Sequence, residues 1–179
     1  MAARGRPQAP DHIVNPNLVL DRDELVENLE NITHRSLVEE TQTDIIVVTR
    51  HGLIHNSFNC PNCNSLCRLN SWNETNAGKI WRCRGQNCNF TKSIRADSFF
   101  DNSHLSLTEI VDFIYFWSKK LSLSYIMEET GIEEWHTAVD WANFIRDICG
   151  FWYVLNFHNN YEIKIIIIDF ISGAQINTR

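Results

Sequence analysis

Two pairs of closely spaced cysteines are the residues of this sequence best placed to do chemistry. Cys60 and Cys63 stand three positions apart, and Cys83 and Cys88 follow after 19 intervening residues. A structural Zn²⁺ takes four ligands in a tetrahedron, each sulfur at about 2.3 Å, and a short loop can supply two thiolates. The spacing therefore predicts one structural zinc ion, with the four sulfurs about 3.5 to 4 Å apart. We expect Gly85 to give the second loop the backbone freedom to turn back.

Two further cysteines compete for a ligand role. Cys67 is close enough to Cys63 to replace it or Cys60, and two histidines lie just upstream, His51 and His55. We expect Cys67 to be a spare. Cys149 lies near the end of a helical pattern and is expected in the core rather than on a metal.

Composition and targeting signals limit the classes of function. The chain has 179 residues, 44% of them hydrophobic, and a formal net charge of -6, which suits one ordinary domain or two small ones. Its beginning contains no apolar signal region, and the most apolar stretch, residues 163–171, is nine residues long and contains two charges. We expect an intracellular protein, nuclear or cytoplasmic, with no membrane partner and no small-molecule substrate; clustered cysteines there bind metals more often than they form disulfides.

Positive charge is concentrated around the cysteine pairs. Residues 60–95 carry six basic side chains and one acidic one, whereas residues 96–150 carry three basic and ten acidic ones. Clustered cations suit phosphate contacts, so the predicted partner is DNA. The expected contacts are Arg82, Arg84, Lys92 and Arg95. Trp81 is a candidate for stacking on a base, although a place in the core is the favoured interpretation.

The sequence around the cysteines also predicts the strands that would hold them in place. Residues 68–70, 79–82 and 90–95 alternate as strands do, which predicts three short strands and a zinc ribbon over residues 57–100. So small a unit needs its metal, which contributes on the order of 10 kcal/mol of folding free energy.

A helical unit is predicted over residues 104–150. Ser106 and Glu109 form a capping-box sequence for a helix at 107–119. Ser122 and Gly131 bound a second helix at 123–130, and a third is expected at 133–148. The order is that of a helix-turn-helix, with a plain three-helix bundle as the alternative, because the third helix begins with two glutamates where a recognition helix normally presents basic or amide side chains.

The remaining segments complete an α+β fold. Residues 1–20 are expected to be a disordered N-terminus, residues 21–56 a helical segment, and residues 151–179 an apolar tail containing a short β segment. Within the helical segment, residues 45–48 are ambiguous. Their β-branched side chains favour a strand, while Gly52 would suit a helix end.

A series of motifs resembles the N-terminal half of ISXO-type DDE transposases, which include transposase-derived proteins of invertebrate genomes. The resemblance covers roughly residues 44–149 and rests on motifs in a fixed order. They are His51-Gly52-Leu53-Ile54, Cys60-Pro61-x-Cys63, Trp81-Arg82-Cys83-Arg84, Cys88, Ser93-Ile94-Arg95, Ser98-Phe99-Phe100, Ser103-His104-Leu105-Ser106-Leu107, Trp141-x-x-Phe144-x-Arg146 and Cys149. In that family a zinc ribbon and a helical region precede a ribonuclease-H-like domain that cuts and joins DNA.

The resemblance implies roles for individual residues. Cys60, Cys63, Cys83 and Cys88 would be zinc ligands, and the phenylalanines of Ser98-Phe99-Phe100 would pack between ribbon and helices. Two positions depart from the family pattern. Asp97 stands where a small residue is usual, and Cys67 replaces an apolar residue. After Gly150 the similarity fades.

Catalysis is not expected. A two-metal strand-transfer site needs at least three carboxylates. Ile165–Asp169 resembles the strand and first catalytic aspartate of the family, but only ten residues follow and none is acidic. Asp169 is then a remnant, or equally an aspartate that closes a strand. The predicted function is that of a truncated, transposase-derived DNA-binding module; the alternatives are a protein-interaction module and, third, a fragment of an active transposase.

Overall fold

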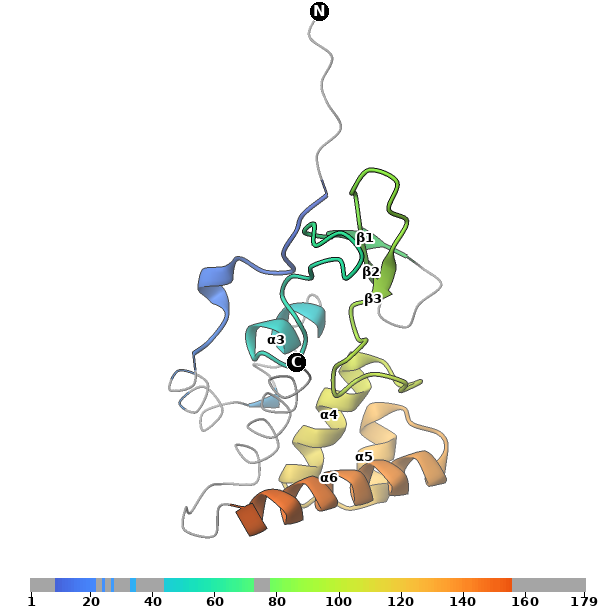
Figure 1. The fold of residues 1–179 in the computed structure, drawn as a ribbon. Coiled ribbons are helices and arrows are strands. Elements are labelled where there is room, and N and C mark those ends of the chain that lie inside the picture. The colour runs from blue at the N-terminus through green and yellow to red at the C-terminus, as the bar shows by residue number, and fades with distance from the viewer. Residues whose placement is uncertain are drawn as a thin grey trace, which may run out of the picture.

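The computed structural model has an α+β fold in which a small sheet stands at one end of a group of helices (Figure 1). It describes residues 9–21, 24, 27, 33–34, 44–72 and 78–155. The elements are η1 (Pro16–Leu18), α3 (Asp44–Arg50), β1 (Arg68–Ser71), β2 (Lys79–Arg82), β3 (Thr91–Ser93), α4 (Leu107–Ser118), α5 (Leu123–Thr130) and α6 (Trp135–Leu155).

The sheet is antiparallel, with strand order β1-β2-β3. Its register places Leu69 opposite Trp81, and Trp81 opposite Lys92. The three strands predicted from alternation are therefore present, and the cysteine pairs lie in the loops beside them.

Helices α4 and α5 lie close to the bounds predicted from the sequence and have the predicted caps. The Oγ of Ser106 accepts a hydrogen bond from the Glu109 N–H at 3.1 Å, and the Glu109 carboxylate accepts one from the Ser106 N–H at 2.6 Å. This is the predicted capping box. Ser122 caps α5, and Gly131 ends it in the left-handed conformation at φ 73°. Helix α4 packs against α3 and α5, and α5 packs against α6.

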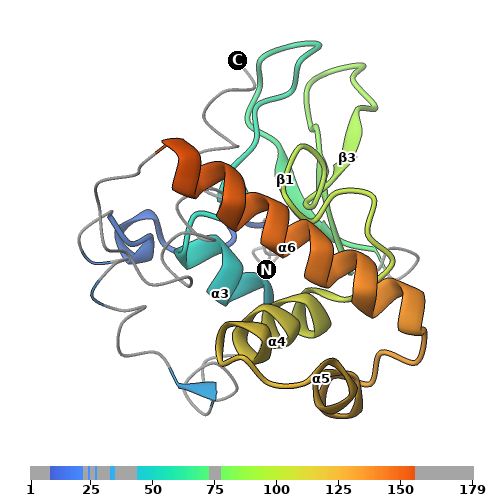
Figure 2. The same cartoon turned by 90° about the horizontal axis from the view of Figure 1, so that it is seen from below.

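Helix α6 is longer than predicted. It runs from Trp135 to Leu155, past both the expected end at 148 and the boundary at 150. The prediction of a β tail is wrong for residues 151–155, because an apolar run without a helix breaker continues a helix as readily as it forms a strand. Residues 156–179, with Asp169, lie outside the described part of the chain. Figure 2 shows α6 running the length of the helical layer.

The ambiguous residues 45–48 belong to α3. The helix ends because Gly52 takes φ 69° and the Leu53 N–H bonds to the Val48 carbonyl at 2.8 Å, which closes a Schellman turn. The part of the predicted helical segment that precedes residue 44 lies mostly outside the described residues.

Part of the N-terminal segment is held against the rest of the fold, contrary to the expectation of disorder over residues 1–20. The Leu69 N–H donates to the Pro10 carbonyl at 2.8 Å. The Asn56 side chain accepts hydrogen bonds from the backbone of Ile13 and Val14 at 3.0 and 2.8 Å. Pro10, Ile13 and Val14 therefore satisfy backbone polar groups through distant partners, which composition does not reveal. Residues 1–8 lie outside the described part.

One hydrophobic core joins the sheet to the helices. It includes Trp81 and Ile94 from the sheet and the residue after it, Phe100 from the connection, and Phe113 and Ile145 from the helices. Trp81 is 1% exposed, so it is a core residue, as favoured, and cannot stack on a base. None of the helices in the described residues is long and apolar enough to span a membrane.

Candidate metal centre

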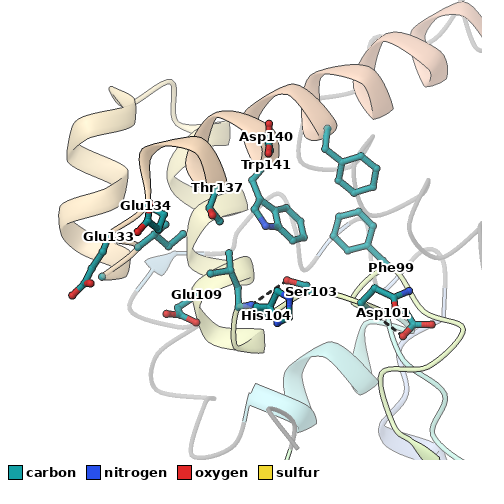
Figure 3. A pocket seen from close by; sticks show the side chains of 15 residues that line it. Phe99, Asp101, Ser103, His104, Glu109, Glu133, Glu134, Thr137, Asp140 and Trp141 are labelled. Atoms are coloured by element: carbon teal, nitrogen blue, oxygen red, sulfur yellow. Dashed lines mark hydrogen bonds between the residues drawn. The ribbon is translucent and has the colours of Figure 1, made fainter.

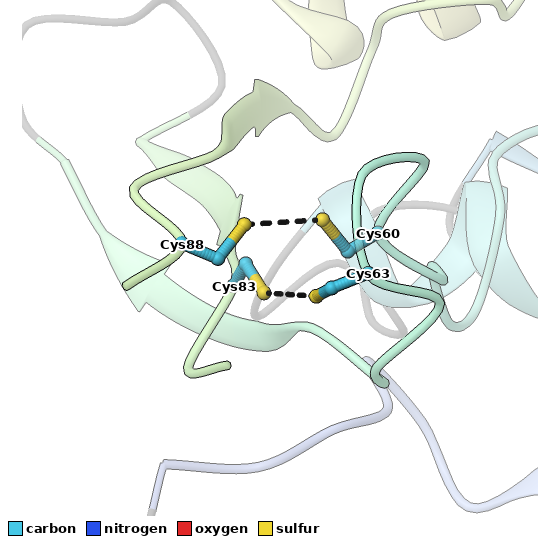
Figure 4. Close-up of side chains that lie close together, drawn as sticks. All are labelled: Cys60, Cys63, Cys83 and Cys88. Carbon is cyan, nitrogen blue, oxygen red and sulfur yellow. Dashed lines mark hydrogen bonds between the residues drawn. The ribbon is translucent and has the colours of Figure 1, made fainter. Parts of the chain in front are cut away.

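The first cysteine loop is a tight turn closed by backbone hydrogen bonds. The Cys60 N–H donates to the Ser65 carbonyl at 2.9 Å, and the Asn64 N–H donates to the Cys60 carbonyl at 2.8 Å. Asn64 has φ 55°, a left-handed conformation that asparagine tolerates better than most residues. The turn presents Cys60 and Cys63 on the same side of the loop (Figure 4).

The second cysteine loop connects β2 to β3. The Cys83 N–H donates to the Phe90 carbonyl at 2.9 Å, which continues the hairpin, and the Cys88 N–H donates to the Gly85 carbonyl at 3.1 Å. Asn87, with φ 60°, supplies the left-handed residue of this turn. The five-residue step from Cys83 to Cys88 thus folds back on itself, as a longer loop must if both sulfurs are to face one point.

The four sulfurs converge. The Sγ atoms of Cys60 and Cys88 are 3.5 Å apart, and those of Cys63 and Cys83 are 3.3 Å apart (Figure 4). All four lie within 4.8 Å of one another and can hold a metal ion. A zinc tetrahedron has sulfur–sulfur edges of about 3.8 Å, so small movements suffice to reach that geometry.

Gly85 is needed for a reason different from the one predicted. A Cβ at this position would stand 2.9 Å from the Sγ of Cys63 and 3.4 Å from that of Cys83. Its N–H also donates to the Cys83 sulfur at 3.3 Å. The left-handed turn is made by Asn87, so Gly85 serves to let the backbone approach the sulfurs.

Neighbouring groups shift the pKa values of two of the thiols in opposite directions. Hydrogen bonds from the Ser65 hydroxyl and backbone, together with the Cys83 thiol, lower the pKa of Cys63 to about 6. The Gly85 N–H lowers the pKa of Cys83, but burial and the neighbouring thiols outweigh it and raise that pKa to about 12. Four thiolates at these distances repel one another, and a divalent cation would allow all of them to ionise.

The two spare cysteines stay outside the cluster, as predicted. Cys67 is buried, and burial raises the pKa of its thiol, as does the negative charge of Cys60. Cys149 packs against the core, and burial raises its pKa. Of the upstream histidines, His51 is buried with its Nδ1 2.8 Å from the Val47 carbonyl, and neither His51 nor His55 belongs to the metal-capable cluster of the described residues.

Two of the four predicted DNA contacts have other roles. Arg95 is 5% exposed, and its Nε and Nη1 donate to the carbonyls of Phe100 at 3.0 Å and Leu105 at 2.8 Å. Burial lowers the pKa of Arg95. The assignment of Arg95 to a DNA-contacting surface is therefore wrong, because its side chain is buried and two of its nitrogens donate to backbone carbonyls. Lys92 forms an ion pair with Asp97.

Strand geometry separates the remaining basic residues. Successive side chains of a strand point to opposite faces, and residues opposite each other share a face. Lys92 is opposite Trp81, so it lies on the other face from Arg82. Arg68 is opposite Arg82, but its guanidinium pairs with Asp11 at 3.2 Å. Arg82 and the nearby Arg84 are exposed, and their guanidinium groups form no ion pair or hydrogen bond with the described residues.

Asn64, Ser65 and Asn87 are site residues that the sequence analysis missed. The asparagines make the turns of the two loops, and Ser65 lowers the pKa of Cys63. The available signal was an asparagine immediately beside the second cysteine of each pair, since this residue type favours left-handed turns.

Comparison of the chain with protein-family models, with curated proteins and with solved structures gives no match.

Proposed function

We propose that Cys60, Cys63, Cys83 and Cys88 hold one structural zinc ion and that the surrounding sheet is a zinc ribbon. The convergence of four sulfurs supports this proposal. An all-cysteine tetrahedral set suits zinc, and it leaves no open position for a substrate. The close approach of Gly85 to two of the sulfurs is a further sign of a built site.

Metal analysis tests the zinc proposal. Purified protein should contain one zinc per chain by mass spectrometry, and Co²⁺ substitution should give the visible spectrum of a tetrahedral tetrathiolate site. Cys83→Ser should lose the metal, whereas Cys67→Ser and Cys149→Ser should retain it, because neither of the latter belongs to the cluster. Iron in place of zinc, or full metal content in Cys83→Ser, would contradict the proposal.

We further propose that this ribbon binds DNA through the phosphate backbone. The observation that carries this proposal is the position of Arg82 and Arg84. Arg82, the last residue of β2, and Arg84, in the loop that follows, are exposed on either side of the buried Cys83, which the metal would hold in place. Two guanidiniums fixed in this way can each contact a phosphate. The resemblance of the motifs to proteins that cut and join DNA points in the same direction.

The expected interaction is modest and sensitive to salt. Two arginines neutralise two phosphates, which gives a log-log salt slope of about -2. Four contacts would have given about -3.6. The proposal includes no reading of bases by α6, because Glu133 and Glu134 precede its first turn and would repel phosphate.

A titration of a labelled DNA duplex of about 20 base pairs, over roughly 25 to 200 mM salt, tests this function. Arg82→Gln with Arg84→Gln should reduce the slope by about 2. Lys120→Gln with Arg146→Gln is a matched control, since it removes the same charge from exposed residues of the helical unit. No binding at the lowest salt, or equal losses in both double variants, would reject Arg82 and Arg84 (the arginine face) as the DNA contact and favour a protein partner for the ribbon.

A further inference from the structure

A second surface lies on the helical unit, away from the cysteines. A cavity of about 670 Å³ opens between α6 and the segment 99–105 that leads into α4 (Figure 3). Glu133 and Glu134 lie at one end, Phe99 and Asp101 at the other, and Trp141 lies between them. The cavity is thus a groove with carboxylates along its length and an aromatic side chain in its middle.

The charge of this groove is strongly one-sided. Five acidic residues line it and no lysine or arginine does. Two carboxylates are engaged by the fold, since Glu109 belongs to the capping box and Asp101 accepts the Asn102 N–H at 2.9 Å. The other three, on or beside α6, are exposed and have no ion pair or hydrogen bond in the part of the chain that the structure describes: Glu133, Glu134 and Asp140.

An aromatic wall stands beside these carboxylates. The Trp141 ring centroid lies 5.7 Å from that of Phe99 and 5.9 Å from that of Phe144. Phe99 and Phe144 stack at 5.3 Å, and Phe144 remains 45% exposed. A large phenylalanine surface is therefore left in contact with solvent next to unpaired negative charge.

Unpaired carboxylates and aromatic side chains of the groove both come from α6 and the residues just before it. Residues 137, 140, 141 and 144 recur at helical spacing within α6, so they form one face, and residue 133 lies just before the helix. In a helix-turn-helix order this is the helix that would approach DNA, but its face would repel phosphate. Its charge and rings instead complement a cation with a flat apolar surface, and a guanidinium is such a cation because it stacks on aromatic rings and binds carboxylates in a bidentate manner.

We propose that this groove binds an arginine-bearing segment of a partner protein. The guanidinium lies against Trp141 and the exposed edge of Phe144, and the carboxylate of Asp140 pairs with it. Glu133 and Glu134 receive a second basic side chain of the same segment. This proposal uses no residue of the cysteine cluster or of the arginine face, so it stands or fails independently of zinc and DNA binding.

Fluorescence anisotropy with short labelled peptides tests the proposal on the full chain. The probes are a peptide of alternating glycine and arginine, the matching lysine peptide and the matching glutamate peptide. The arginine peptide should bind, the lysine peptide should bind several-fold more weakly, and the glutamate peptide should not bind. The combined variant Glu133→Gln, Glu134→Gln, Asp140→Asn should bind the arginine peptide at least about tenfold more weakly.

A matched triple variant separates the groove from net charge. Glu128→Gln, Glu129→Gln, Asp147→Asn removes the same charge from exposed residues that do not line the groove, and it should change the affinity by less than about twofold. Phe144→Ala should erase the preference for arginine over lysine, since it removes the exposed ring. Equal losses in both triple variants, no binding of the arginine peptide, or equal binding of free spermidine would overturn the proposal.

Discussion

Replacing Gly85 by alanine is the most direct test of how the cysteine cluster is built. The added Cβ would stand 2.9 Å from the Cys63 sulfur, whereas ordinary contacts lie at 3.4–4 Å. The sulfur or the loop must therefore move by at least about 0.5 Å, against a tolerance of about 0.2 Å for a metal–ligand distance. Overpacking of this kind costs about 1–3 kcal/mol, which corresponds to a loss of metal affinity of roughly 5- to 150-fold.

The assay is zinc competition with a chromophoric chelator, accompanied by thermal unfolding of the zinc-loaded protein. Gly150→Ala is a suitable control, because nothing lies within 4 Å of its added Cβ, and it should leave zinc affinity unchanged. Zinc affinity of Gly85→Ala within about twofold of that of the native protein would refute the steric explanation.

Three further predictions concern the fold and its protons. Phe113→Ala, at a position 0% exposed, should lower the free energy of unfolding in urea by about 3–5 kcal/mol. Lys120→Gly, at φ 61° after α4, should raise the free energy of unfolding by about 1 kcal/mol, whereas Gly131→Ala, at φ 73°, should lower it by about 1–2 kcal/mol. Thermal melts should therefore shift in opposite directions for these two variants. Zinc affinity should fall as pH is lowered, because protons compete for thiolates such as Cys63, whose pKa is about 6, and equal affinity at about pH 5.5 and pH 7.5 would contradict thiolate ligation.

Features fixed by neighbours in the sequence were predictable. The capping box of Ser106 and the glycine end of α5 at Gly131 each depend on a few residues within one turn. In such places a residue type has few conformational alternatives, so the pattern and the structure agree.

Features decided by distant contacts were not predictable. Asn56 holds Ile13 and Val14 through hydrogen bonds that span more than 40 positions of the chain, and no local pattern marks it. The end of α6 was predicted wrongly for another reason. Residues 151–155 are apolar, and an apolar run suits a buried helix and a strand alike.

Arg95 shows how a charge count can misplace a function. By sequence it belongs to the basic segment, residues 60–95, yet its guanidinium donates to the carbonyls of Phe100 and Leu105. Leaving a buried carbonyl unpaired costs about 1–3 kcal/mol. Moving the Arg95 side chain to the surface would break both of these hydrogen bonds. Both acceptors lie in the segment that forms one wall of the acidic groove. The same side chain therefore reduces the cationic surface available to DNA and fixes the shape of the anionic surface proposed for a basic partner.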